Sequence, residues 1–213
     1  MLRMVPLPTS FAGGEKLMTF TPVPAGELAA VVTYLEIREP PVLEVPASPL
    51  RLHRTEQPEL AAYRALFRLV GAPWLWFSRL ILDDARLAAI IHDPAVELFH
   101  VEDEGGNAVG MLELDFRESG ECELAFVGLV PELSGHGHGR WLLAEALRRA
   151  WRDDVTRVHV HTCSLDHPAA LGAYRRAGFA AFKRAIERFP DPRLLGILPK
   201  DCAPQIPLLG TDD

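Results

Sequence analysis

The sequence is poor in cysteine and has no long hydrophobic run. It contains three cysteines in 213 residues, Cys122, Cys163 and Cys202. Because this number is odd and the positions are far apart, we expect free thiols in a reducing compartment rather than a disulfide framework. No apolar run reaches the length that spans a bilayer, and the N-terminus lacks the hydrophobic core of a signal peptide. These absences exclude a small disulfide-stabilised secreted domain and predict a cytoplasmic protein with no membrane partner.

Clusters of positive charge are also lacking. The chain has 22 lysine and arginine residues against 29 aspartate and glutamate residues, which gives a formal net charge of −7. No group of basic residues is interleaved with aromatic ones, and a protein that binds nucleic acid needs clustered cations to neutralise the phosphates. We therefore expect no nucleic-acid partner. The acidic balance suits a cationic or amine substrate.

Length and hydrophobic content predict one large domain. With 48% hydrophobic residues, the chain can fill a substantial core. We expect a loose leader over residues 1–25, a single domain over residues 26–190 and a C-terminal tail over residues 191–213, because proline recurs at both ends. Four prolines between residues 40 and 49 predict an extended linker.

Hydrophobic periodicity predicts most of the regular elements. Short apolar or alternating runs predict strands over residues 29–37, 96–101, 108–116, 157–163 and 179–189. Residues 60–70, 83–91 and 168–177 are predicted to be helices.

The stretch from Glu121 to Leu147 combines a strand, a glycine-rich turn and a helix. In its first part Leu124, Phe126 and Gly128 alternate with Glu123, Ala125 and Val127, which predicts a strand. Three glycines then occupy every second position: Gly135, Gly137 and Gly139. From Arg140 the apolar period becomes that of a helix that runs to about residue 151. Backbone N–H groups of such a turn, together with the helix dipole, predict a site for a phosphate or pyrophosphate.

Known glycine motifs distinguish between the kinds of anion site. The dinucleotide fingerprint fails because Arg140 stands where its third glycine belongs, and no Gly-Lys-Ser/Thr follows as in a Walker loop. The run VGLVPELSGHGHGRWLL instead resembles the acyl-CoA-binding signature of the GNAT superfamily of N-acetyltransferases, with Ser134, Gly137 and Gly139 at its defining positions. A second run, HTCSLDHPAALGAYRRAGF, resembles the other GNAT signature through His167, Ala170, Tyr174 and Gly178–Phe179. The resemblance covers roughly residues 96–189.

The resemblance implies both a fold and an activity. The implied fold is the α/β (α+β) GNAT fold: a mixed, mostly antiparallel sheet of about six to seven strands, with helices on both faces and a splay between the fourth and fifth strands. The implied activity is transfer of an acetyl group from acetyl-CoA to a primary amine, directly within a ternary complex and without a metal. Ser134 replaces the usual Gln or Arg, and His167 replaces the usual Asn. These departures motivate the alternative, a catalytically weak acyl-CoA-binding or regulatory module.

The two signatures also imply the residues that bind acetyl-CoA. They are Val127, Leu129, Ser134, Gly135, His136, Gly137, His138, Gly139, Arg140, His167, Ala170 and Tyr174. Among them, the backbone N–H of Leu129 is expected to polarise the thioester carbonyl. The imidazoles of His136 and His138 are either additional donors or exposed spacers. His167 or Asp166 is alternatively expected to cap the helix that follows.

Two side chains are expected to carry the chemistry. Glu123 matches the strand position at which histone-type relatives have their catalytic glutamate, so we expect it to be the general base, with partial burial raising its pKa. Glu121, on the same side of the strand, and ordered water are the alternatives. Tyr174 matches the tyrosine that protonates the CoA sulfur in relatives.

The acceptor is the least determined part of the site. The resemblance places the acceptor wall in the loop over residues 71–82, so we expect Trp74, Trp76 and Glu121 at the substrate; the alternative is that the tryptophans anchor the helices to the sheet. The acceptor itself is a small-molecule or peptide amine of undetermined identity, and monomer and homodimer both stay open. The side chains of His159, His161 and Cys163 share one strand face, but such positions lie too far apart to converge on one ion, so we expect no metal.

Overall fold

The computed structural model describes residues 20–42 and 44–210, and most of the predicted leader lies outside this part of the chain. Seven strands form one sheet: β1 (Glu27–Ile37), β2 (Arg51–Thr55), β3 (Val96–Glu102), β4 (Ala108–Asp115), β5 (Glu121–Leu129), β6 (Arg157–Cys163) and β7 (Ala180–Pro190). The helices are α1 (Leu60–Gly71), α2 (Asp84–Ile91), α3 (His138–Ala150) and α4 (Ala170–Arg176), with short 3₁₀ turns η1 (Ala72–Trp74) and η2 (Pro131–Leu133). None of the helices in the described part of the chain has both the length and the apolar character that crossing a bilayer requires.

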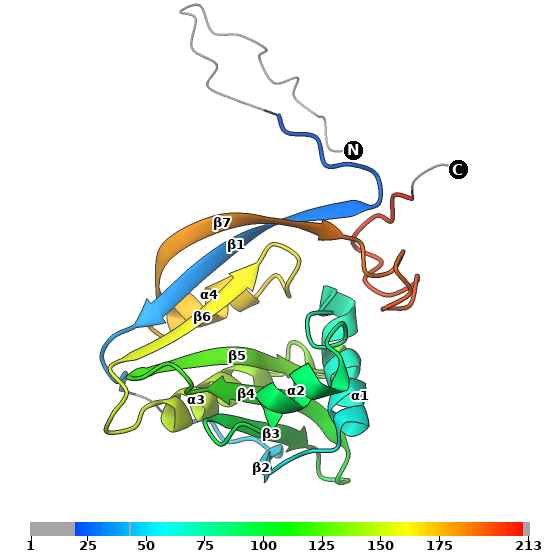
Figure 1. The fold of residues 1–213 in the computed structure, drawn as a ribbon. Helices are drawn as coiled ribbons and strands as arrows, with labels where there is room; N and C mark the ends of the chain where they lie inside the picture. The colour runs from blue at the N-terminus through cyan, green and yellow to red at the C-terminus, as the bar shows by residue number, and fades with distance from the viewer. Residues whose placement is uncertain (1–19, 43, 211–213) are drawn as a thin grey trace, which may run out of the picture.

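The sheet has the order β2-β3-β4-β5-β6-β1-β7 and is antiparallel except between β5 and β6. These two strands pair over only three positions, from Glu121 opposite Arg157 to Glu123 opposite His159. Beyond them β6 turns away from β5 together with β1 and β7 (Figure 1). The prediction of a mixed, mostly antiparallel sheet is confirmed. So is the predicted splay between the fourth and fifth strands of the sheet, which are β5 and β6.

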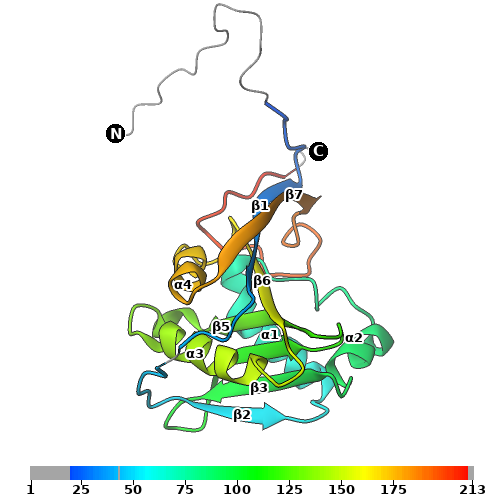
Figure 2. The same ribbon diagram turned by 90° about the vertical axis from the view of Figure 1, so that its left-hand side faces the viewer.

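Helices cover both faces of the sheet, as predicted. On one face, α1 and α2 pack with Leu98 of β3 and Met111 of β4 in one hydrophobic core. On the other face, α3 packs with Leu112, Leu114 and Leu124, and the apolar side of α4 lies against the same core. In Figure 2, α3 and α4 lie on the left of the sheet and α2 lies on the right.

Strand β2 was not predicted: the prolines between residues 40 and 49 predicted a linker, and no element was assigned between that linker and the helix at residue 60. Its sequence, RLHRT, has no apolar alternation, and none of its residues is fully buried. It is an edge strand that pairs only with β3. The hydrogen bonds offered by β3 therefore create this strand, and its own side chains carry no signal of it.

The simple alternation predicted for β5 is wrong at one position. Residue pairing between β4 and β5 places Leu124 opposite Leu114 and Phe126 opposite Glu113, which leaves Ala125 as an extra residue. This β-bulge reverses the side-chain direction. As a result Leu124 points to the α3 side while Phe126 points to the α1 side. Glu123 and Phe126 consequently face the same way, although their positions differ in parity.

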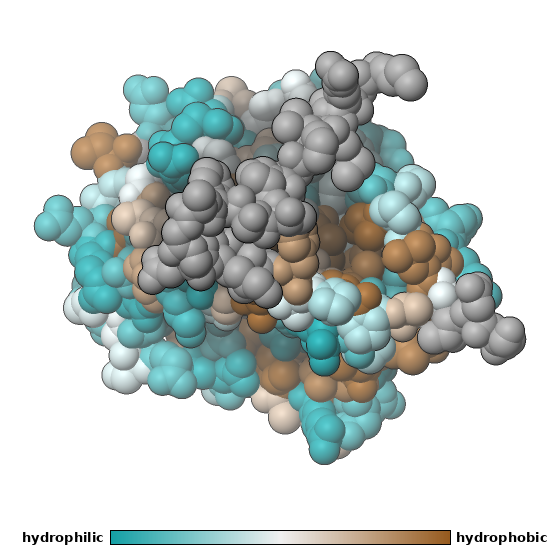
Figure 3. Space-filling view, turned by 90° about the horizontal axis from the view of Figure 1, so that it is seen from above, coloured by the Kyte–Doolittle hydropathy of each residue, from teal (hydrophilic) through white to brown (hydrophobic). Residues whose placement is uncertain are grey.

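Residues 191–210 contain no helix or strand but are packed. Leu198 and Ala203 form a small core with Leu75, the first residue of the loop between η1 and α2. Other apolar side chains of the segment stay exposed, Leu195 among them. In Figure 3, hydrophobic residues gather on the right, the side on which this segment lies in Figure 1. The C-terminal segment therefore packs against the loop between η1 and α2 through this small core.

Candidate active site

A cavity of about 1260 Å³ opens where β5 and β6 separate. One end is lined by the glycine turn, the start of α3 and α4, including Gly137, Arg140 and Tyr174. The other end is lined by residues of the η1–α2 loop, β5, β6 and β7, including Arg79 and Glu123. One continuous space thus joins both parts of the site predicted from the sequence.

The glycine turn presents free backbone donors. Gly135 and Gly137 have φ angles of +82° and +83°, which L side chains rarely adopt. Gly137 is the N-cap of α3, so the helix begins at His138, two residues earlier than predicted. Within the described residues, the N–H groups of residues 135–139 have no hydrogen-bond acceptor. A helix N-terminus with five free amides is suited to an anion such as pyrophosphate.

The imidazoles of the two histidines of the turn differ in their surroundings. His136 is exposed, and neither imidazole lines the cavity. The Nδ1 atom of His138 lies 3.3 Å from the hydroxyl of Ser48, so this ring is directed at the preceding linker. Of the two alternatives for the imidazoles, the geometry favours spacers. The remaining residues predicted to bind acetyl-CoA all line the cavity.

The pairing register determines where the N–H of Leu129 points. Val130 donates its N–H to the carbonyl of Val109 at 2.9 Å, and Leu129 stands opposite Gly110. Because hydrogen-bonded and non-hydrogen-bonded pairs alternate in an antiparallel ladder, the N–H of Leu129 points away from β4. It faces the gap left by β6, where a polarised carbonyl oxygen would need a donor.

Tyr174 projects from α4 into the same cavity. Its ring packs edge-on against Phe179, with centroids 5.7 Å apart. Burial, and to a lesser extent the charge of Asp166, raises the pKa of the Tyr174 hydroxyl. The phenol is therefore protonated at neutral pH and available as a proton donor.

The caps expected for α4 are not formed. Asp166 accepts hydrogen bonds from the Thr162 hydroxyl at 2.7 Å and the Cys163 N–H at 2.8 Å, so it closes the turn after β6. The Nδ1 atom of His167 accepts from the N–H of Ala169 at 3.1 Å, before the helix starts, and α4 has no side-chain cap. His167 also lines the cavity.

Glu123 lines the cavity and is held by His161. The Nδ1 atom of His161 lies 3.0 Å from the Glu123 carboxylate. This hydrogen bond holds the pKa of Glu123 below its usual value, although burial acts in the opposite direction. The expectation that burial would raise this pKa is therefore wrong, because the sequence did not reveal the imidazole partner.

Glu121 lies outside the cavity lining. Its carboxylate accepts a hydrogen bond from Arg157 at 2.7 Å and lies 3.5 Å from the Nε2 of His159. These contacts join β5 and β6 at the first of their three parallel pairs, Glu121 opposite Arg157. The two glutamates share one side of the strand, as predicted, but only Glu123 lines the cavity, so the expectation that Glu121 lies at the substrate is not supported.

Trp76 lies between the helices and the sheet. Its ring contacts Phe67 of α1 and Phe126 of β5, with centroids 5.8 and 5.2 Å apart. Its Nε1–H donates to Asp166 at 3.1 Å. Trp74 meets the ring of His167 edge-on at 4.9 Å. Both tryptophans line the cavity. Trp76 also anchors the helices to the sheet, as the alternative for the two tryptophans proposed.

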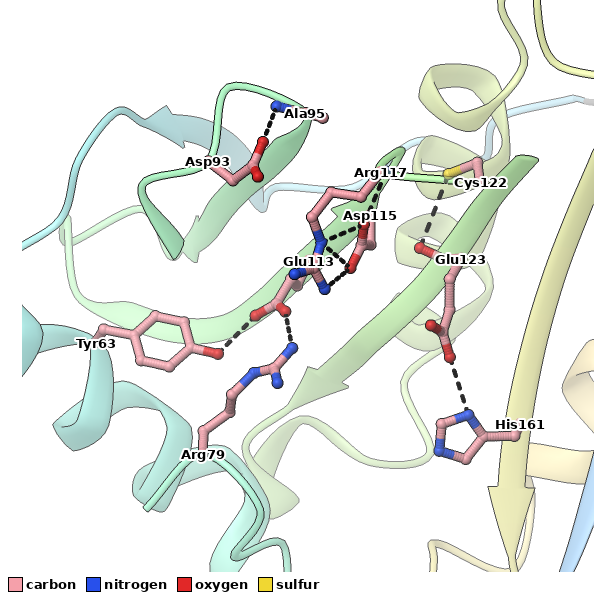
Figure 4. A network of polar contacts seen from close by, with 10 residues as sticks. All are labelled: Tyr63, Arg79, Asp93, Ala95, Glu113, Asp115, Arg117, Cys122, Glu123 and His161. Carbon is pink, nitrogen blue, oxygen red and sulfur yellow. Dashed lines mark hydrogen bonds and ion pairs between the residues drawn. The ribbon is translucent and has the colours of Figure 1, made fainter. Parts of the chain in front are cut away.

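A buried polar network on β4, the strand next to the one that carries Glu123, was missed by the sequence analysis (Figure 4). Glu113 is fully buried and accepts hydrogen bonds from the Tyr63 hydroxyl at 2.6 Å and from Arg79 at 2.5 Å. Beside it, Asp115 pairs with Arg117. A signal was present, because Glu113 and Asp115 are charged residues at the end of the apolar run AVGMLELD.

The cysteine at the cavity is not a reactive one. Burial raises the pKa of the Cys163 thiol to about 11, with the Asp166 charge as a further cause, so the thiol stays protonated at neutral pH. Among the described residues, no three histidine, cysteine or acidic side chains gather as metal ligands would.

Comparison with known proteins agrees with this geometry. No curated protein matches the sequence. A GCN5-related N-acetyltransferase from Sphaerobacter thermophilus has a similar structure, with a TM-score of 0.51 and 20% identity over 78% of this chain, which spans only 52% of that protein. A spermidine N-acetyltransferase from Vibrio cholerae in complex with CoA and spermine has a TM-score of 0.52 and 21% identity, covering 70% of this chain and 99% of that one. An aminoglycoside acetyltransferase from an uncultured soil metagenomic sample, in complex with sisomicin, gives 0.51 and 18%, covering 65% and 93%.

At these identities the similar structures show the fold alone. The sequence itself matches the acetyltransferase (GNAT) family over residues 63–179, which is more than half of the chain. This segment contains the strand that carries Glu123, the glycine turn and Tyr174. The protein therefore belongs to the GNAT acetyltransferase family.

Proposed function

We propose that the protein is an N-acetyltransferase that transfers an acetyl group from acetyl-CoA to a primary amine, directly within a ternary complex. The observation that carries this proposal is the continuous cavity between the free amides of the glycine turn and the Glu123–His161 pair. An acyl donor bound at the turn and an amine bound at the other end would meet at the gap between β5 and β6.

The residues present fit acetyl-CoA as a substrate. The five free N–H groups of residues 135–139 would hold its pyrophosphate, and an added Cβ at Gly135 or Gly137 would meet no protein atom within 4 Å, so space lies next to the turn. Bound acetyl-CoA supplies a thioester carbonyl. The N–H of Leu129 would donate to that oxygen, and the protonated Tyr174 would give its proton to the departing sulfur.

The acid–base group of the proposal is Glu123, acting on the amine either directly or through a group that it holds. The acceptor end of the cavity carries Trp74 and Trp76 as apolar walls, together with Glu123 and Glu187. Aromatic faces and carboxylates together suit a cationic amine. The amines named with the similar structures, spermidine and sisomicin, are therefore reasonable first probes, beside an α-amino acid and a peptide with a free N-terminus.

The proposal is tested by calorimetry with acetyl-CoA, followed by CoA release with this panel of amines. Gly137→Ala should weaken acetyl-CoA binding, because the added Cβ strains a left-handed residue within the anion site. Gly196→Ala is the matched control: its φ is +69°, its Cβ position is also open, and it does not line the cavity. Binding without turnover on any amine would instead favour the acyl-CoA-binding module. Absence of binding would refute the interpretation of the glycine turn.

We also propose a cytoplasmic location. Cys122, Cys163 and Cys202 are all free thiols. Unpaired cysteines are typical of a reducing compartment. Fractionation of cells with an antibody against the chain tests this proposal.

A further inference from the structure

We infer that His161 is the catalytic base that takes the proton from the acceptor amine, and that Glu123 is a positioning residue that holds its imidazole. This inference rests on the proposed acetyl transfer and refines it. The sequence analysis considered His161 only as a metal ligand. The structure places it instead in the cavity lining, beside Glu123.

The position of His161 follows from the sheet. The last pair of β5 and β6 is Glu123 opposite His159, so His161 lies two residues further along β6, where the strands have begun to part. Its side chain is 50% exposed and lines the cavity. An imidazole at this point reaches the space in which an acceptor amine must meet the acyl carbon.

Glu123 fixes the tautomer of the imidazole. An ionised carboxylate can only accept a hydrogen bond, so Nδ1 of His161, 3.0 Å away, must carry the hydrogen. The neutral ring then has its lone pair on Nε2, the nitrogen on the other side of the ring (Figure 4). Within the described part of the chain, Nε2 makes no hydrogen bond. A base oriented by a carboxylate with one free nitrogen is the arrangement that general-base catalysis requires.

The charges around the ring favour the imidazole over the carboxylate as the base. The hydrogen bond to Glu123 raises the pKa of His161 above its usual value; burial opposes this, and the charges of Glu123, Asp166 and Glu187 add to it. On β1, the centroid of the Tyr34 ring lies 5.8 Å from that of the imidazole. The Nζ atom of Lys183 on β7 lies over the same tyrosine ring, 4.9 Å from its centroid.

The same hydrogen bond lowers the pKa of Glu123. His159, a further titratable neighbour on β6, has a pKa that burial lowers. A base works best when its pKa lies near the working pH. The pKa of the imidazole is shifted upwards from its ordinary value, towards neutral pH, whereas the pKa of the carboxylate is shifted away from it.

The proton balance of the step is complete. The acceptor ammonium gives one proton to Nε2 of His161 and becomes a neutral amine. Its nitrogen forms a bond to the carbonyl carbon, and the thioester C–S bond breaks. The thiolate takes the proton of the Tyr174 hydroxyl, and the tyrosinate recovers a proton through solvent from the newly formed, still protonated amide nitrogen. The His161 imidazolium then releases its proton to solvent, which is the one proton that the overall reaction sets free. No oxidant, reductant or metal is needed.

The test is the pH dependence of kcat/KM with the amine of the panel that turns over fastest. We expect activity to rise with an apparent pKa above 6.5 in the wild-type protein. His161→Gln should remove this limb and lower kcat/KM about 10²- to 10⁴-fold, the usual worth of a general base. Glu123→Gln should move the limb down towards about 6.5, the value of an unperturbed imidazole. His159→Gln is the matched control and should leave the limb in place, since His159 does not line the cavity.

A second readout does not depend on turnover. At a pH above the activity limb, the ¹⁵N chemical shifts of His161 should show a neutral ring protonated on Nδ1 in the wild-type protein. A ring protonated on Nε2 would overturn the inference. So would an activity limb below pH 4.5 that moves upwards in His161→Gln, since the carboxylate would then be the base. Lack of turnover on every amine would refute the proposed function itself, and the inference with it. Turnover whose pH dependence shows the limb of the carboxylate instead of that of the imidazole would refute the inference and leave the proposed function standing.

Discussion

The buried ion pair of the C-terminal segment offers a quantitative test of the fold. Both side chains of Arg193 and Asp191 are 2% exposed. They are joined through Nη2 to Oδ2 at 2.7 Å and through Nε to Oδ1 at 3.0 Å. The Nη1 atom also donates to the carbonyl of Ile206 at 2.9 Å. Arg193→Met keeps a long side chain but removes the charge and every one of these donors.

The expected loss follows from what remains buried. In Arg193→Met the Asp191 carboxylate has no counter-ion, and breaking a buried pair from one side costs about 3–5 kcal/mol. The double variant Asp191→Asn with Arg193→Met leaves a neutral amide instead. The double variant loses mainly the hydrogen bond to the Ile206 carbonyl, and such a bond from a charged donor contributes about 1.5–3 kcal/mol to the free energy of unfolding. We therefore expect the double variant to be more stable than the single one by about 2 kcal/mol.

Urea unfolding monitored by circular dichroism measures these differences. Arg38→Met is the matched control: it also removes an arginine from an ion pair, with Glu36, but its side chain is 65% exposed and the loss should stay below about 1 kcal/mol. Hydrogen exchange should increase around Pro73, because its carbonyl accepts from Gln205 of the same segment at 2.7 Å. If Arg193→Met costs no more than the control, the buried pair does not hold the segment and the reasoning is wrong.

Three further predictions concern the site. Gly71→Ala should destabilise the protein by about 1–3 kcal/mol in urea unfolding, because the added Cβ would lie 2.5 Å from the Cβ of Trp76; a more stable variant would contradict the packing. Tyr63→Phe should cost about 1–3 kcal/mol by the same measurement, since it leaves an oxygen of the buried Glu113 without its donor; a loss under about 0.5 kcal/mol would contradict this. His161→Gln should cost about 0.5–1 kcal/mol near pH 5.5, after allowance for solvent exposure. Because the folded-state pKa of His161 is raised, this stabilisation is fully present below about pH 6.5 and is lost as the pH rises through the folded value. Equal differences in stability at pH 5.5 and pH 9 would refute this assignment.

Most elements were predictable because their signals are local. The apolar period of residues 60–70 predicted α1 within one residue of its observed bounds, Leu60–Gly71. The glycine turn was equally legible, since positive φ angles at Gly135 and Gly137 favour glycine whatever surrounds them. The family resemblance predicted that the fourth and fifth strands part. The pairing confirms this and shows that it ends at Glu123.

Other features depend on partners far along the chain. Strand β2 exists because β3 offers it an edge, and β1 lies between β6 and β7 although it comes first in sequence. The C-terminal segment looked irregular, and its packing depends on the small core with Leu75 and on its buried arginine, which donates to carbonyls ten or more residues away. Local periodicity carries no information about such contacts.

The candidate site shows the same division. By itself the sequence determined the glycine turn that presents free amides, because such a turn depends on backbone conformation and on short spacing. The residues expected to line one end of the cavity were implied by the family resemblance. Only the tertiary structure decided which carboxylate faces the cavity and what holds it. Ala125, one extra residue in the ladder, sets the side to which the strand's later side chains point, and the partner of Glu123 lies 38 residues away on β6. Side-chain direction and electrostatic partners are properties of the assembled sheet, and that is why the imidazole emerged only from the fold.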